Sequence, residues 1–226
     1  MHWKPLVVIP LLCAAASSFA GEEQVLFNRV YLDAQAERQI PNDEMRVILV
    51  TEHQGKSPAD LAARVNSDMA WALELAKGAK DVVSGTGSYR TFPLYQDKLI
   101  VGWRATQELE LTSTSMARLT ELTGKLQERL QVRDMQFRPT KATRDRFQEE
   151  LMEEALAAFK RRAEIVGRHM PSKDYRIVEM HVNAGGGPQP VMYERAMMKM
   201  DAGGAPAVEA GTSLLIVTVS GNVQYY

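Results

Sequence analysis

The side chains with the sharpest chemical character lie towards the C-terminal end of the chain, where four methionines follow a histidine. They are Met192, Met197, Met198 and Met200, with His181 nearby in sequence. Thioether sulfur is a soft ligand that suits Cu(I), so these five residues are the candidates for a copper site. Methionines at such spacing also fill irregular gaps in a core or contact a partner protein. Because composition alone does not define a site, we assign no metal or cofactor to them.

The other histidines stand outside any recognised motif. His53 and His169 do not fall in an HExxH spacing, and the single cysteine, Cys13, cannot complete a zinc set. We expect His53 at the end of a strand and His169 at the C-terminus of a helix, where a cation suits the helix dipole. We therefore expect both histidines to have structural or solvent-facing roles.

Two further patterns resemble sites without completing one. Four carboxylates share one predicted helix and could hold a hard metal ion, but the Glu-x-x-His motif of helical di-metal sites is absent. Nearby basic residues favour a solvated, mixed-charge face. Residues 85–88 (Gly-Thr-Gly-Ser) lack the third glycine and the following helix of a phosphate loop, so they predict a strand bulge or bend. The carboxylates are Glu149, Glu150, Glu153 and Glu154. No catalytic residue is assigned.

The first twenty residues predict export. Lys4 precedes an apolar stretch, Leu6 to Ala16, and Ser18-Phe19-Ala20 forms a small-x-small site before Gly21. The stretch is shorter than the ~20 apolar residues of a spanning helix. The sequence therefore predicts a cleaved signal peptide over residues 1–20 and a periplasmic protein, with an uncleaved membrane anchor as the alternative.

Cleavage after Ala20 is directly testable. The protein recovered from a periplasmic extract is expected to begin at Gly21, because the small-x-small site ends there. N-terminal sequencing or intact mass measures this. An intact Met1, or a lipid-modified Cys13, would contradict it.

The charge balance and the cysteine count exclude several classes of partner and bond for the mature chain. Loss of Lys4 reduces the 27 basic residues to 26, against 28 acidic ones. This balance offers no basic excess for nucleic acid and no polybasic run for an anionic membrane. Loss of Cys13 leaves no disulfide, so a core of roughly 205 residues must hold the fold alone. We expect no nucleic-acid partner and no membrane-spanning segment after cleavage.

Hydrophobic periodicity predicts an alternation of strands and helices. The period-2 pattern predicts strands over 30–37, 45–50, 99–111, 135–138, 175–182 and 213–219, with two strand segments within 81–95. Helical spacing predicts helices from Ser57 to Gly78, over 119–130 and over 143–169. This order predicts an α+β fold of largely antiparallel sheet with helices covering one face. No linker divides residues 21–226.

Short motifs, taken in order, resemble the SIMPL-domain family of exported bacterial proteins. The match spans nearly all of the mature chain, although the family's early glycines are replaced here by residues 33–37 and its glycine after the second helix is missing at 132–134. The matching residues are Pro41-Asn42-Asp43, Asn66 and Met69, Ser88-Tyr89 through Pro93-Leu94-Tyr95, Gly102-Trp103-Arg104-Ala105, Met192 with Arg195-Ala196-Met197, and Pro206 with Gly211.

The resemblance implies an α+β domain of two packed sub-lobes, located in the periplasm or envelope and linked to stress responses such as oxidative stress. It supplies no catalytic residues. Our first hypothesis is a non-catalytic protein that acts by self-assembly or partner binding. The alternatives are a periplasmic enzyme with an unrecognised site, and a soft-metal or oxidant buffer that uses its methionines.

Assembly is favoured by the segment from Ala184 to Gly211. It is rich in Gly, Pro, Ala and Met, and it is long for a connection inside a compact domain. Such a composition adapts to another surface more readily than it packs alone. We therefore expect a homo-oligomer with this segment at or near a subunit contact, and an unknown protein partner remains open.

Overall fold

The middle of the chain builds one antiparallel sheet. In the computed structural model, which describes residues 27–185, 187, 189–190 and 210–226, this sheet has the strand order β3-β4-β2-β5. Its odd-numbered β2 residues from Met45 to Thr51 are buried, as the alternation of a half-covered strand requires. The strands are β2 (Glu44–Gly55), β3 (Val83–Gln96), β4 (Leu99–Ser113) and β5 (Gln131–Arg138).

Two helices, α1 (Pro58–Gly78) and α2 (Met116–Leu126), cover one face of this sheet. Helix α1 begins where the sequence predicts, because the Ser57 hydroxyl accepts a hydrogen bond from the Asp60 backbone N–H at 3.3 Å and Pro58 occupies the first turn. The buried residues of α1 recur every three or four positions. They are Leu61, Val65, Met69, Ala72 and Ala76. We call this half of the molecule the α1–α2 lobe.

The two ends of the chain meet in a second antiparallel sheet. Strand β8 (Thr212–Tyr225) lies between β1 (Arg29–Pro41) and β6 (Tyr175–Asn183), and the short β7 (Gln189–Pro190) also pairs with β8. Buried and half-buried residues alternate along the whole of β8, as expected for a central strand with one covered face.

Helix α3 (Lys141–Gly167) covers this second sheet, and together they form the α3 lobe. Its buried residues are spaced by four, which makes a continuous row inclined to the helix axis. They are Leu151, Ala155, Phe159, Ala163 and Gly167. The Tyr225 ring lies so close to Gly167 that a Cβ there would be 3.1 Å from it, and the Tyr225 hydroxyl donates to the Ala163 carbonyl at 2.7 Å.

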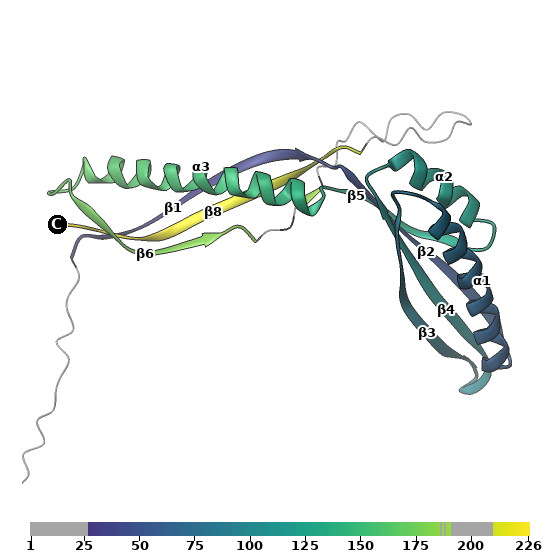
Figure 1. The fold of residues 1–226 in the computed structure, drawn as a ribbon. Coiled ribbons are helices and arrows are strands. Elements are labelled where there is room, and N and C mark those ends of the chain that lie inside the picture. Colours follow the sequence, from purple (N-terminus) through teal and green to yellow (C-terminus); the bar gives the residue numbers. More distant parts are fainter. Residues whose placement is uncertain (1–26, 186, 188, 191–209) are drawn as a thin grey trace, which may run out of the picture.

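The two lobes lie end to end, and each has its own hydrophobic core (Figure 1). Polar residues join them where β1 passes into β2. The Asn42 side chain donates to the Ala210 carbonyl and accepts from the Ser213 hydroxyl, both at 2.7 Å. Asp43 accepts from the Thr140 backbone N–H at 2.6 Å, so it ties the start of β2 to the start of α3.

The α+β prediction, with antiparallel sheets in two sub-lobes and helices on one face of each, is confirmed. Two details differ from the sequence pattern. Strand β3 is continuous, with the expected irregularity between Thr86 and Tyr89. Strand β8 runs on to Tyr225 because β1 pairs with it as far as Gln224 and β6 pairs with it from Thr218 to Tyr225. The predicted signal peptide (1–20) and residues 191–209 of the predicted contact segment lie outside the described residues.

Candidate functional site

His53 and Asp68 form the most chemically specific pair in the described part of the chain. His53 lies near the end of β2, as predicted, and Asp68 lies on α1 above it. The His53 Nε2 atom is 2.7 Å from the Asp68 Oδ2 atom. The Thr51 hydroxyl donates to the same oxygen at 3.1 Å. Both side chains of the pair are more than two-thirds buried, so their contact is only partly screened by solvent.

This pair belongs to a polar row that crosses the covered face of the sheet. Thr51 is buried and lies opposite Gln107 of β4 in the strand register. The Gln107 Oε1 atom is buried without a hydrogen-bond partner among the described residues. The row separates the main core of the α1–α2 lobe from a small cluster of Leu61, Val65 and Ala105.

Arg129 and Trp71 bound the pair on its other side. The Arg129 Nη1 atom is 3.8 Å from the Asp68 Oδ1 atom, and its guanidinium carbon lies 4.7 Å from the centre of the Trp71 ring. A cation stacked on an aromatic ring and paired with a carboxylate is held in one orientation. The Asp68 carboxylate therefore contacts three groups: the His53 imidazole, the Thr51 hydroxyl and the Arg129 guanidinium.

The arrangement can orient an imidazole, as a carboxylate does for a catalytic histidine. It does not place a nucleophile, because the Thr51 hydroxyl donates to Asp68 and not to His53. Among the described residues, no group of three or more His, Cys, Asp or Glu side chains is arranged to hold a metal ion. The chemistry available here is proton exchange at His53.

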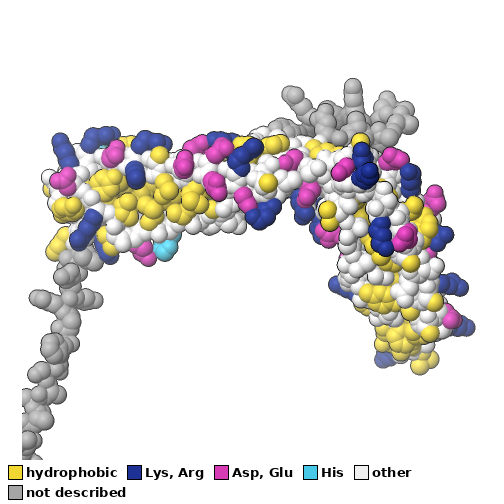
Figure 2. All heavy atoms as spheres, in the orientation of Figure 1, with side chains coloured by type: hydrophobic (Ala, Val, Ile, Leu, Met, Phe, Trp, Pro, Cys, Tyr) yellow, Lys and Arg dark blue, Asp and Glu magenta, His cyan; other side chains and the backbone are white. Residues whose placement is uncertain are grey.

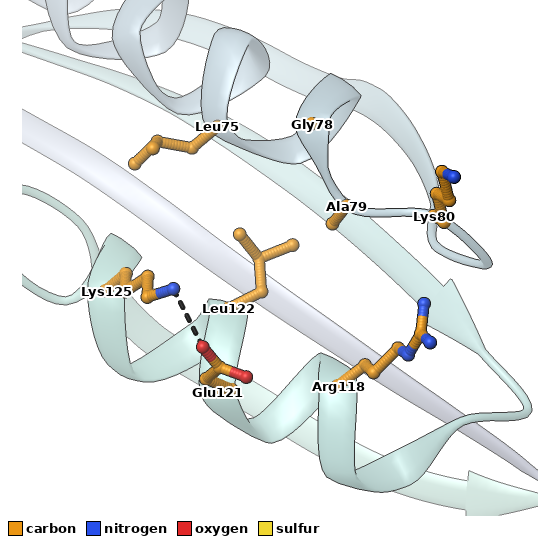
Figure 3. Close-up of a pocket in the computed structure, with 8 residues that line it drawn as sticks. All are labelled: Leu75, Gly78, Ala79, Lys80, Arg118, Glu121, Leu122 and Lys125. Atoms are coloured by element: carbon orange, nitrogen blue, oxygen red, sulfur yellow. Dashed lines mark hydrogen bonds and ion pairs between the residues drawn. The ribbon is translucent and has the colours of Figure 1, made fainter.

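A second candidate is an open groove of about 510 Å³ between the end of α1 and α2 (Figure 3). Leu75 and Leu122 give it an apolar wall, while Lys80, Arg118 and Lys125 lie around it. Two of these cations are already engaged, Arg118 with Asp81 and Lys125 with Glu121. The groove is lined by no histidine, cysteine or hydroxyl side chain.

The sequence candidates are dispersed. His181 lies on β6 and contacts Glu179 at 3.0 Å, on the sheet face away from α3. His169 is exposed just after the end of α3. The four methionines, Met192, Met197, Met198 and Met200, lie outside the described residues.

Two carboxylates of the predicted cluster on α3 form ion pairs with an arginine. Glu150 and Glu154 both pair with Arg38 of β1, which fits the predicted mixed-charge face. The sequence reasoning did not single out Asp68, Arg129 or Trp71. A signal was present for His53, because it continues the odd-numbered series of β2 that faces the helices.

A family comparison matches residues 30–225 to the SIMPL model, described as a protein of unknown function (DUF541). The chain belongs to the SIMPL family. The resemblance found in its motifs is thereby confirmed over most of the chain. A comparison with curated proteins finds no significant match for this SIMPL protein.

Solved structures with local similarity are only distantly related to the SIMPL protein. One, from Burkholderia cenocepacia, is described as an amidohydrolase/peptidase (13% identity, TM-score 0.28, 46% of this chain and 28% of that chain). Others are AtUAH in complex with glyoxylate (11%, 0.27, 49% and 29%) and an amidase of the hydantoinase/carbamoylase family from Burkholderia vietnamiensis (11%, 0.23, 46% and 27%). The aligned region is under a third of each of those proteins, and likeness at this level carries no functional argument.

Proposed function

We propose that this SIMPL protein acts without catalysis, in the bacterial periplasm or envelope, by assembling with further copies of itself. The observation that supports assembly most is an apolar side of β6 that α3 leaves uncovered. The predicted signal peptide and the exported character of the family support the location. In the described residues, no helix is both long and apolar enough to cross a membrane.

Helix α3 packs on β1 and β8 and barely reaches β6. On β6, the residues Ile177, Met180 and Val182 lie opposite Val223, Gly221 and Val219 of β8, so they point to the same side of the sheet as the buried valines. Ile177 and Val182 nevertheless remain about 40% exposed. We call these three β6 residues the β6 stripe. Figure 2 shows hydrophobic side chains gathered along the α3 lobe.

A second copy of the chain suits this surface. Partly exposed apolar side chains that lie near one another favour an interaction site, and β6 lies at the edge of its sheet among the described strands. Two copies related by a two-fold axis would present the same stripe to each other, which is the commonest way in which soluble proteins assemble.

Light scattering on the protein beginning at Gly21 tests this at micromolar concentration, where an oligomer mass is expected. The double variant Ile177→Glu, Val182→Glu is expected to shift the mass towards the monomer, because it buries two carboxylates in the contact. The matched control Asn183→Glu lies beside Val182 but points to the opposite face of β6, and it is expected to keep the oligomer. A monomer mass for the unaltered protein removes the proposal.

The role in envelope or oxidative stress is tested through the same variants. A strain that lacks the gene is expected to lose peroxide tolerance, and the unaltered gene is expected to restore it more fully than the Ile177→Glu, Val182→Glu gene. The His53–Asp68 pair favours the enzymatic alternative. If His53→Ala removes peroxide tolerance while the protein stays oligomeric, the enzymatic hypothesis is favoured and the assembly hypothesis is contradicted.

A further inference from the structure

The hairpin between β3 and β4 projects beyond the rest of the α1–α2 lobe. Strand β2 ends at Gly55, which pairs with Trp103, and α1 starts only at Pro58. Beyond Trp103, β4 therefore pairs with β3 alone. We call residues 92–102, which include the turn at Asp97 and Lys98, the hairpin tip.

The hairpin tip is apolar although almost nothing covers it. Leu99 is 70% exposed and Tyr95 is 64% exposed, and three further tip residues are about half exposed. In a turn region, polar residues are the usual occupants. Figure 2 shows hydrophobic side chains gathered at this end of the lobe. The three half-exposed residues are Phe92, Ile100 and Val101.

Both faces of the tip are apolar. Ala105 is buried under α1, so its neighbour Arg104 points to the opposite face, and Phe92 pairs with Arg104 there. The pairing shifts between Leu94 and Tyr95, and beyond this irregularity Tyr95 lies opposite Ile100 of β4. On β4, Leu99, Ile100 and Val101 are consecutive and fill both sides of the free edge. A protein groove would cover one face, whereas a fluid layer can surround both.

Unpaired cations surround the tip. Lys56, Arg90 and Lys98 form no ion pair with any described residue, and Asp97 is the only carboxylate of the tip. Lysine stems can lie along an apolar surface while their ammonium groups reach lipid phosphates. Tyrosine, here the exposed Tyr95, favours the boundary between apolar and aqueous layers.

We propose that the hairpin tip binds the surface of an anionic phospholipid bilayer, with the edge of β4 entering at the level of the headgroups and upper acyl chains. Three residues of extended β4 span roughly 10 Å, which matches the depth of interfacial insertion. At this depth the free backbone groups of the edge still reach water, as they must. Apolar burial supplies most of the affinity, since the chain has no polybasic run.

Flotation with vesicles tests the proposal. The protein beginning at Gly21 is mixed with vesicles of phosphatidylethanolamine and phosphatidylglycerol, or of phosphatidylcholine alone. Binding to the first is expected to be stronger, and to weaken severalfold but persist in 0.5 M NaCl, because salt screens only the charge contribution. The Leu99→Ser, Ile100→Ser variant is expected to bind at least about tenfold more weakly.

The matched control is Val83→Ser, Ile165→Ser, which replaces two apolar residues of the same exposure elsewhere on the surface and is expected to bind like the unaltered protein. The Ile177→Glu, Val182→Glu protein is expected to bind vesicles as well, so the tip is tested apart from assembly. No binding of the unaltered protein to either vesicle, or equal binding by the Leu99→Ser, Ile100→Ser variant, overturns the proposal. Loss of oligomer mass in that variant shows instead that the tip contacts protein.

Discussion

Gly221→Ala is expected to destabilise the α3 lobe by about 3 kcal/mol, the upper end of what overpacking a well-packed site costs. Gly221 lies in the central strand β8, opposite Met180 and beside the irregularity of β6 between Ile177 and Glu179. A Cβ at this position would overlap the Glu179 backbone oxygen and lie 3.2 Å from the Met180 Cα atom. Because both neighbours are backbone, only a shift of β6 can relieve the overlap.

Urea unfolding of the protein beginning at Gly21 measures this effect. The two tryptophans left after signal removal, Trp71 and Trp103, both lie in the α1–α2 lobe. Tryptophan fluorescence therefore reports on the α1–α2 lobe, whereas far-ultraviolet circular dichroism reports on both lobes. An unfolding midpoint that falls more by dichroism than by fluorescence locates the destabilisation in the α3 lobe. Gly85→Ala is the control, because a Cβ at Gly85 meets nothing within 4 Å. Equal midpoints for the two variants would contradict the expectation.

Asp43→Ala is expected to lower the stability of the protein by about 2 kcal/mol or more, since it removes three hydrogen bonds to a carboxylate at the N-terminus of α3 at once. The Asp43 carboxylate accepts from the Thr140 backbone N–H at 2.6 Å, from the Thr140 hydroxyl at 3.1 Å and from the Thr143 hydroxyl at 2.5 Å. It therefore fixes the N-terminus of α3 against the start of β2. Urea unfolding by dichroism measures the loss.

The same carboxylate gives this contribution a pH dependence. Burial opposes ionisation of Asp43, but the hydrogen bonds from Thr143 and Thr140 outweigh it and lower the pKa below the ordinary 3.8. The folded state thus keeps the charged form to lower pH than the unfolded chain does. The stabilisation is complete above about pH 3.8 and is lost as the pH falls through the folded value.

Asp43→Asn isolates this effect. The stability difference between the unaltered protein and Asp43→Asn is expected to shrink as the pH falls from 5 towards 3, as measured by urea unfolding at each pH. A difference that stays constant with pH would mean that Asp43 acts through its shape and not through its charge.

Local signals explain which parts of the fold could be predicted from the sequence. The start of α1 depends on Ser57 and Pro58, which act within one turn, and the buried stripe of α3 repeats every four residues in the sequence itself. The contact between His53 and Asp68 could not be predicted in this way. It depends on how α1 crosses β2, which is set by the packing of the whole layer.

The exposed hairpin tip has a similar explanation. The alternation of apolar and polar residues in the sequence assigns Leu99 and Val101 to the same apolar face as Ala105. It does not show how far the elements that cover this face extend. Because β2 stops at Gly55 and α1 starts at Pro58, the cover ends at Trp103. The apolar pattern continues beyond it into solvent.

The α1–α2 lobe is inserted in the sequence between the strands of the α3 lobe, which sets an order in which the chain can fold as it emerges during synthesis. The α1–α2 lobe is one continuous stretch, residues 44–138, and can complete its sheet as soon as β5 is available. Strand β1 emerges before this lobe, but its sheet partner among the described residues is β8, which begins at Thr212. The α1–α2 lobe can therefore be complete while β1 still lacks its described partner strand, and an unpaired strand of this kind is open to pairing with another chain during that interval.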